Sequence, residues 1–149
     1  MKGKWLAAVL TLLLAAATVG QAVRWSHRRT ASRLLAESEA RTLSAVRMRP
    51  VPADLIATNL EALRQAAPLD PVEVGIPIAR GTQYFLLSRP EPAIAAYRDS
   101  LALESRSEGY LNLGRSLWLA GRFDEARESF RRAVRLDPHL ARLVPPGGL

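Results

Sequence analysis

YLNLGRSLWLAGRFDEARESFRRAVRLDP, residues 110–138, is the stretch that decides the fold. It places small residues, aromatic residues and a closing proline at intervals that suit two helices packed side by side. We predict helices over residues 107–120 and 124–136, joined by the turn AGRF. Asp124 and Glu125 fall in the first turn of the second helix, where acidic side chains suit the helix dipole.

The same plan appears one unit earlier in the chain. Residues 74–88 read as a helix interrupted near its start by Pro77, RPEP turns the chain, and residues 93–104 form the returning helix. An offset of 33 residues, which indicates a tandem repeat, relates Gly81 to Gly114, Ala93 to Ala126 and Tyr97 to Phe130. The glycine and the alanine let the two helices of a pair approach closely, while the aromatic ring fills the space beside them.

The later unit resembles the tetratricopeptide repeat (TPR) family. The pattern W-x₂-L-G-x₂-Y…A-x₃-F…P is matched by Tyr110, Leu113, Gly114, Leu117, Ala126, Phe130 and Pro138. The resemblance covers 107–138 well and 73–106 less well, because Pro77 and Arg80 replace the expected aromatic residue and leucine, and Ser105 replaces the closing proline. It implies an all-α fold in which helical hairpins stack, since one pair cannot bury its apolar face alone.

The family resemblance also implies a binding groove lined by the first helix of each pair. Its inward-facing residues by analogy are Ile78, Thr82, Phe85, Leu111, Asn112, Arg115 and Trp118. Phe85 and Trp118 are 33 residues apart, so the stack is expected to bring two aromatic anchors together. The alternative is that Trp118 is simply buried against its own second helix. The lysine and asparagine pattern of family members that clamp a terminal carboxylate is absent.

The segment WLAAVLTLLLAAATVGQAV, residues 5–23, carries no charge. At about 1.5 Å per residue it spans roughly the 30 Å of a bilayer's hydrocarbon core. Trp5 and Trp25 stand at its ends, where indoles favour the headgroup zone. We therefore predict a single-pass transmembrane helix within an anchor region, residues 1–29. A secretory signal cleaved near Gly20-Gln21-Ala22, which would release a secreted binding domain, is the alternative.

The net charge of +7 is concentrated around this segment. Six of the 21 basic residues and none of the 14 acidic residues lie in residues 1–33, so the rest of the chain is close to neutral and nucleic acid is not an expected partner. Basic residues on the two sides of the segment nearly balance, so the positive-inside rule favours a cytoplasmic C-terminal side only slightly. The position near the start resembles an export signal and favours an extracytoplasmic soluble domain at the cell membrane.

Residues 30–72 form a repeat-like helical hairpin or, alternatively, part of an irregular bundle. Its first helix is expected to continue the membrane segment, with an apolar face made by Ala31, Leu34, Leu35, Leu43, Val46 and Met48. RPVP at 49–52 stops that helix, and residues 54–67 return, placing Asn59 on the apolar face. Residues 139–149 are a short cap and tail, which leaves apolar surface for a partner or a second copy of the chain.

No motif in the sequence predicts catalysis. The two histidines are far apart and the chain has no cysteine, so we expect no metal site. The glycines form no phosphate-binding loop. We expect no cofactor and no enzymatic activity. The predicted function is that of a membrane-anchored adaptor or scaffold for protein partners; the alternative is a structural or self-assembling subunit of a membrane complex.

Overall fold

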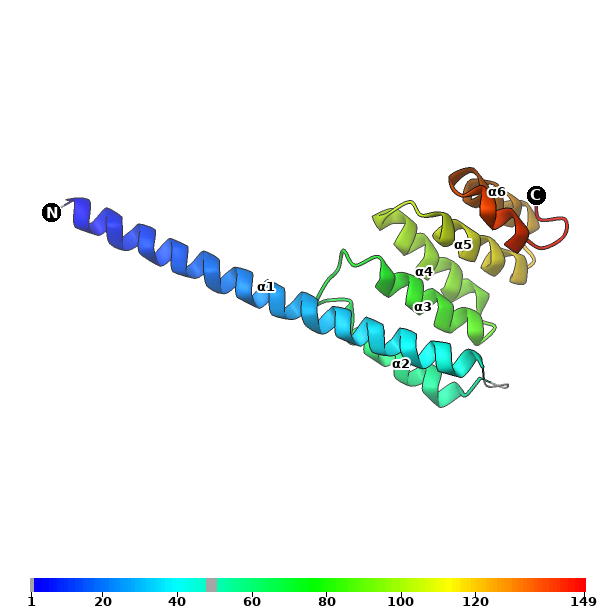
Figure 1. The fold of residues 1–149 in the computed structure, drawn as a ribbon, viewed down its shortest axis with the longest axis horizontal. Coiled ribbons are helices and arrows are strands. Elements are labelled where there is room, and N and C mark those ends of the chain that lie inside the picture. The colour runs from blue at the N-terminus through cyan, green and yellow to red at the C-terminus, as the bar shows by residue number, and fades with distance from the viewer. Residues whose placement is uncertain (1, 48–50) are drawn as a thin grey trace.

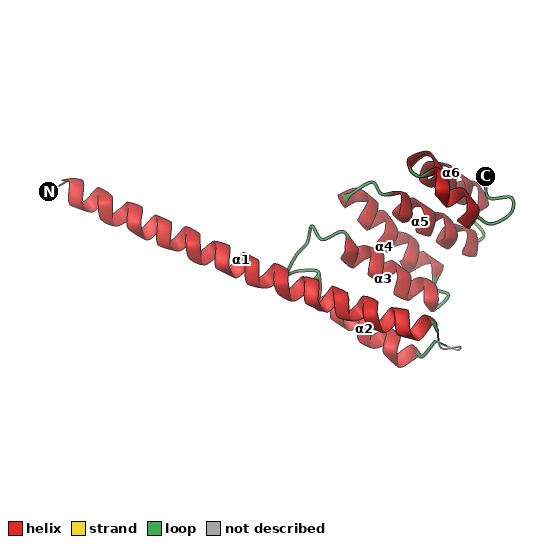
Figure 2. Ribbon diagram, in the orientation of Figure 1, coloured by secondary structure: helices red, strands yellow, loops and turns green. Residues whose placement is uncertain are grey.

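The computed structural model describes residues 2–47 and 51–149, which form α-helices, one short 3₁₀ helix and no strand (Figures 1 and 2). The helices are α1 (Lys2–Val46), α2 (Ala53–Ala66), α3 (Gly75–Leu86), α4 (Pro90–Leu103), α5 (Ser107–Leu119), α6 (Phe123–Leu136) and the 3₁₀ helix η1 (Pro138–Leu143). They pack as three successive hairpins, α1 with α2, α3 with α4 and α5 with α6, and these hairpins stack side by side (Figure 1). The prediction of a stack of helical hairpins is confirmed.

Helix α1 is 45 residues long, about 68 Å. Its N-terminal half projects from the stack, and every described side chain from Val9 to Val19 is exposed (Figure 1). Packing starts at Ala31, which is fully buried. In the described part of the chain, Val9–Val46 is the one helix long and apolar enough to cross a membrane, which makes it compatible with an anchor.

The buried face of α1 differs from the predicted one. Leu43 is 70% exposed and Val46 is 47% exposed, whereas Ser38 and Ala45 are fully buried. The predicted Ala31, Leu34 and Leu35 do pack in the core against α2 and α3. The prediction is wrong only toward the C-terminal end of the face, where three- and four-residue steps lead to small and polar positions. Met48 and the first two residues of the predicted stop at 49–52 lie outside the described residues.

A buried polar cluster, defined by Ser38, Thr42, Asn59 and Gln83, joins the first hairpin to α3. The Gln83 side-chain amide donates to Thr42 Oγ1 at 2.8 Å, and the Asn59 amide donates to Thr42 Oγ1 at 3.2 Å and to Gln83 Oε1 at 3.3 Å. Asn59 is fully buried, so its predicted position on the packed face is confirmed, although its contacts are polar. These mutual hydrogen bonds offset part of the cost of removing the amides from water, while Oδ1 of Asn59 and Oγ of Ser38 are buried without a hydrogen-bond partner among the described residues.

The second and third hairpins share one packing contact at the 33-residue offset. A Cβ atom placed on Gly81 would lie 2.7 Å from Cε1 of Tyr97, and one placed on Gly114 would lie 2.6 Å from Cδ1 of Phe130. In each hairpin the glycine therefore lets an aromatic ring of the returning helix lie directly on the backbone of the first helix. The predicted role of these glycines is confirmed.

Pro77 does not interrupt α3, contrary to the prediction. The helix starts at Gly75, so Pro77 is its third residue. Backbone N–H groups in the first turn of a helix have no partner within that helix, and a proline there removes none of its hydrogen bonds. After α6, residues 138–143 form a 3₁₀ helix at the end of the stack.

The turns within the α3–α4 and α5–α6 hairpins also have matching hydrogen bonds at an offset of 33 residues. The sequence pattern did not reveal this match. The N–H of Arg89 donates to the carbonyl of Tyr84 and the N–H of Arg122 donates to the carbonyl of Leu117, both at 2.9 Å. Such bonds, closed around a left-handed residue, end helices in the Schellman motif. That residue is Gly121 in one turn (φ 75°) and Ser88 in the other (φ 54°).

Replacing Ser88 by glycine should raise the free energy of unfolding by about 0.5–1 kcal/mol. A left-handed conformation costs a residue with a side chain about 1–2 kcal/mol, and the greater chain entropy of unfolded glycine cancels part of that gain. The matched change Gly121→Ser should lower the free energy of unfolding, because a Cβ there meets no atom within 4 Å and only the backbone angle matters. Urea denaturation followed by circular dichroism measures both; a stabilised Gly121→Ser would contradict this explanation.

Candidate functional site

A cavity of about 460 Å³ lies where the C-terminal ends of α3 and α5 meet the tail that follows η1. We call it the Trp118 pocket. It is lined by Phe85, Arg115, Trp118, Leu119, Arg142, Leu143, Val144 and Pro145. Two hairpins and the tail are therefore needed to form it. Apolar side chains make most of its wall, and two arginines stand beside them.

The structure brings three of the predicted groove residues together in this pocket: Phe85, Arg115 and Trp118. Ile78, Thr82 and Asn112 are partly buried along α3 and α5 and do not line it. Leu111 is only 4% exposed and belongs to the hydrophobic core, where it supports this face from below. Phe85 and Trp118 share one cavity, as expected from their 33-residue spacing.

Trp118 is held from one side by its own hairpin. Its ring meets that of Phe123 edge-on, with centroids 4.9 Å apart, and lies 6.3 Å from the ring of Phe130. Trp118 therefore does pack against α6, the second helix of its own hairpin, as the alternative in the sequence analysis expected. Trp118 is only half-buried by these contacts, and the surface that they leave exposed lines the pocket. A ring fixed in this way loses little conformational freedom on binding, which suits an anchor residue.

Arg115 is positioned by the last residue of η1. Its Nη2 atom donates to the carbonyl oxygen of Leu143 at 3.2 Å. Among the described residues no carboxylate lies within ion-pair distance of Arg115 or of Arg142. By contrast, Arg132 pairs with Glu128 at 2.9 Å on the outer helix. The Trp118 pocket thus carries positive charge that the described residues do not neutralise.

Tyr97 lies beneath this face, with its hydroxyl 3.2 Å from the Thr82 hydroxyl. Burial raises the pKa of Tyr97, and the hydrogen bond with Thr82 and the charge of Arg115 oppose that rise without reversing it. The phenol therefore stays neutral at physiological pH and does not neutralise Arg115. Among the described residues, no group of three His, Cys, Asp or Glu side chains lies close enough to hold a metal ion.

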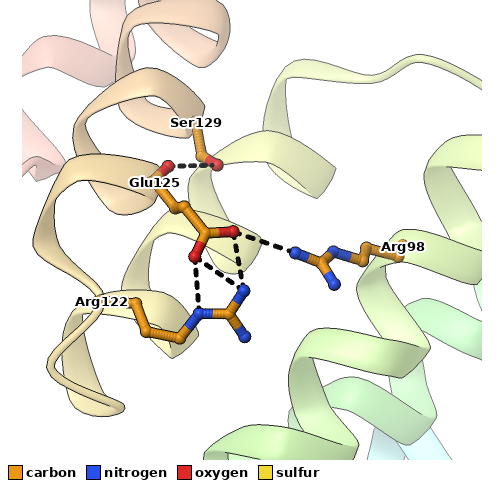
Figure 3. A network of polar contacts seen from close by, with 4 residues as sticks. All are labelled: Arg98, Arg122, Glu125 and Ser129. Carbon is orange, nitrogen blue, oxygen red and sulfur yellow. Dashed lines mark hydrogen bonds and ion pairs between the residues drawn. The ribbon is translucent and has the colours of Figure 1, made fainter.

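An ion pair between Arg98 and Glu125 connects the second and third hairpins. Glu125 accepts hydrogen bonds from Nε and Nη2 of Arg122, both at 2.7 Å, and one from Arg98 of α4 at 3.2 Å (Figure 3). Arg122 belongs to the turn that precedes α6, and Arg98 belongs to the neighbouring helix α4.

The Glu125 pairing should make stability depend on pH. Hydrogen bonding to Arg122 lowers the pKa of Glu125 below its ordinary value of 4.5. A carboxyl group with a lowered folded-state pKa stabilises the fold above its ordinary pKa, and this stabilisation is lost as the pH falls through the folded-state pKa. We expect Glu125→Gln to lower the Tm at pH 7 and to have little effect at the acid end of the titration.

The matched substitution Glu91→Gln gives the control for that titration, because no ion pair of Glu91 is present among the described residues. Its effect on Tm should be smaller at pH 7. In 1 M salt, where the Debye length is about 3 Å, the effect of Glu125→Gln should shrink. An effect of Glu125→Gln independent of both pH and salt would contradict the ion-pair explanation.

Residues 107–140 match the family model described as tetratricopeptide repeat. The α5–α6 hairpin is thus similar to a tetratricopeptide repeat. The match includes Arg115 and Trp118 but ends before Arg142 and before the tail that closes the Trp118 pocket. No curated protein matches the chain.

Solved TPR structures resemble the fold over most of the chain. The first TPR domain of human RPAP3 is 18% identical, with 74% of this chain and 81% of that chain covered and a TM-score of 0.66. The first TPR of Spaghetti (RPAP3), bound to the HSP90 peptide SRMEEVD, has the same identity and TM-score, with 74% of this chain and 82% of that chain covered. A thermophilic TPR protein of Thermus thermophilus is 25% identical, with 91% of this chain and 71% of that chain covered and a TM-score of 0.69.

Sequence reasoning missed five of the eight residues that line the pocket. Leu119, Arg142, Leu143, Val144 and Pro145 were not among the expected groove residues. The cap and tail were expected to leave apolar surface for a partner, but not to form a wall with Phe85 and Trp118. The apolar run Leu143, Val144 and Pro145 was the signal that this segment packs over the ends of α3 and α5.

Proposed function

We propose that this chain is a membrane-anchored adaptor that holds a partner protein in the Trp118 pocket. The observation that carries the proposal is the convergence of Phe85, Trp118 and the unneutralised Arg115 in one cavity. A solved neighbour with this fold holds a peptide of HSP90, which supports a protein segment as the ligand class. The proposed organisation is an anchor (1–29), a repeat-like hairpin (30–72), a degenerate TPR (73–106), a TPR (107–138) and a cap with tail (139–149).

The pocket chemistry favours an acidic segment that carries one large apolar side chain. The apolar wall buries that side chain, and burial of apolar area favours binding by about 25 cal/mol per Å². Arg115 and Arg142 border the same cavity and attract carboxylates, which form bidentate pairs with guanidinium groups. Ile78, Thr82, Leu111 and Asn112 remain proposed as the support and continuation of this surface.

The proposed site is tested with the full chain in lipid nanodiscs and two synthetic peptides. One peptide carries a phenylalanine flanked by glutamates, and the other has lysines in place of the glutamates. Fluorescence polarisation should show that the glutamate peptide binds and the lysine peptide does not. Trp118→Ala and Arg115→Glu should each weaken binding at least about tenfold, the effect of losing 1.4 kcal/mol.

Arg131→Glu is the matched control, because Arg131 is exposed on α6, outside the pocket, and the charge change is identical. This variant should bind the glutamate peptide like the wild type. Equal binding of the two peptides, or equal losses in Arg131→Glu and Arg115→Glu, would overturn the proposed site. The Tm of each variant shows whether a loss comes from unfolding.

A self-assembling subunit is the second candidate, favoured by apolar surface at the end of the stack. Leu143 is 43% exposed and Leu149 is 56% exposed, next to a cap of only six residues. A stack with an incomplete cap has a face that a second copy can cover. Mass measurement in detergent should then give a defined oligomer without any peptide, and a monomer would contradict this candidate.

The proposed localisation is that of a single-pass cell-membrane protein with its stack on the extracytoplasmic side.

A further inference from the structure

Helix α1 fixes the height of the stack above a bilayer. Residues 24–30, which separate the apolar segment from the packed half of the helix, contain no glycine and no proline. The side chains of Ser26 and Thr30 hydrogen-bond to carbonyls of the preceding turn, at 2.8 and 3.0 Å. From Val23 to the fully buried Ala31 is about 12 Å of continuous helix. A rigid spacer this short keeps the stack next to the membrane surface.

The loop between α2 and α3, residues 67–74, reaches back along α1 toward its projecting half (Figure 1). Asp70 in this loop pairs with Arg28, with 3.7 Å between Oδ2 and Nε. Arg28 lies only about 7–8 Å beyond Val23 along the helix axis. The headgroup region of one leaflet is roughly 5–8 Å thick. The loop is therefore level with the outer headgroups.

The side chains at this level suit a phospholipid surface. Val72, in the loop, is 64% exposed. Trp25 is 62% exposed and carries Arg29 over its ring, with the guanidinium carbon 5.0 Å from the ring centroid. An exposed indole and a group of arginines are typical of the headgroup zone. Asp70 adds little repulsion there, because Arg28 neutralises it.

We infer that the loop of residues 67–74 rests on the lipid headgroups, with Val72 as its contact, so that the stack lies on the membrane. This inference rests on the proposed anchor. Helices α3 and α5 both run from this edge to the opposite one, where the Trp118 pocket lies (Figure 1). The pocket therefore opens on the edge away from the bilayer, within reach of another protein at the same surface.

The absence of cysteine from the chain makes the test direct, because one introduced cysteine is the only labelling site. Val72→Cys is labelled with an environment-sensitive fluorophore in the full chain, reconstituted in phosphatidylcholine–phosphatidylglycerol vesicles. Leu119→Cys, an exposed apolar position that lines the Trp118 pocket at the opposite edge of the stack, is the matched control for the label position. Lipids spin-labelled on the headgroup should remove most of the emission at position 72 and leave that at position 119 unchanged.

A second variant lengthens the spacer. Seven helix-forming residues inserted after Ser26 keep the helix face and raise the loop by about 10 Å, so quenching at position 72 should be lost. Alkaline carbonate extraction is run on every sample. Protein that washes off overturns the anchor itself. Protein that resists extraction, with position 72 no more quenched than position 119, overturns the headgroup contact and leaves the anchor standing.

Discussion

Replacing Phe130 by alanine should lower the free energy of unfolding by about 3–5 kcal/mol. Phe130 has no exposed surface and is the largest fully buried side chain among the described residues. Its ring packs on the backbone at Gly114 and lies against Trp118, so the truncation leaves a cavity between α5 and α6. Urea denaturation of the full chain in detergent, followed by circular dichroism, measures the loss.

Phe123→Ala is the matched control, since it removes the same side chain from a residue that is 46% exposed. It should cost less than about 1.5 kcal/mol, mainly through the lost ring contact with Trp118. Because a domain is typically stable by only about 5–15 kcal/mol, the loss expected for Phe130→Ala can be large enough to prevent folding. Phe130→Leu then provides a smaller truncation, and equal losses at positions 123 and 130 would contradict the described core.

Replacing Gly114 by leucine should cost about 1–3 kcal/mol through overpacking. A Cβ atom at position 114 would lie 2.6 Å from both Cδ1 and Cε1 of Phe130, closer than carbon atoms approach one another. The ring or the helix backbone has to move, and either movement weakens the packing of α5 against α6. The Tm and the urea midpoint of the variant should both fall.

The contact between Gly114 and Phe130 is isolated by a double-mutant cycle. Gly114→Ala adds only the Cβ atom, and Phe130→Leu removes part of the ring that this atom would meet. In the Phe130→Leu background Gly114→Ala should cost less than in the wild type, with a coupling of about 0.5–3 kcal/mol. Additive effects would show that the glycine does not act through the ring.

The fold was largely predictable because two hairpins repeat the same contacts. The sequence placed Gly81, Gly114 and their aromatic partners correctly, since close helix packing needs a small residue opposite a large one. The C-terminal part of the α1 face was mispredicted because small and polar side chains, among them Ser38 and Ala45, occupy it. A buried polar cluster depends on partners from three helices, and the pattern of one helix cannot supply them.

The candidate site was predictable only where it follows the repeat. Phe85 and Trp118 were expected together from their spacing, and they share the Trp118 pocket. Arg142 comes from a tail that belongs to no repeat, so the repeat pattern gave no position for it. The turn residue Ser88 was missed for another reason: serine rarely adopts a left-handed angle, and only the hydrogen bonds around it reveal that it occupies the place of a glycine.

The continuity of α1 from Lys2 to Val46 has a mechanical consequence. With this helix as the proposed anchor, one continuous helix connects the bilayer to the stack. Transmembrane helices tilt by about 20° on average and adjust their tilt to the thickness of the membrane. Any such adjustment swings the whole stack through the same angle, because Ala31 and Ala45 lock the helix into its hairpin. The thickness of the bilayer would thus set the orientation of the Trp118 pocket relative to the membrane.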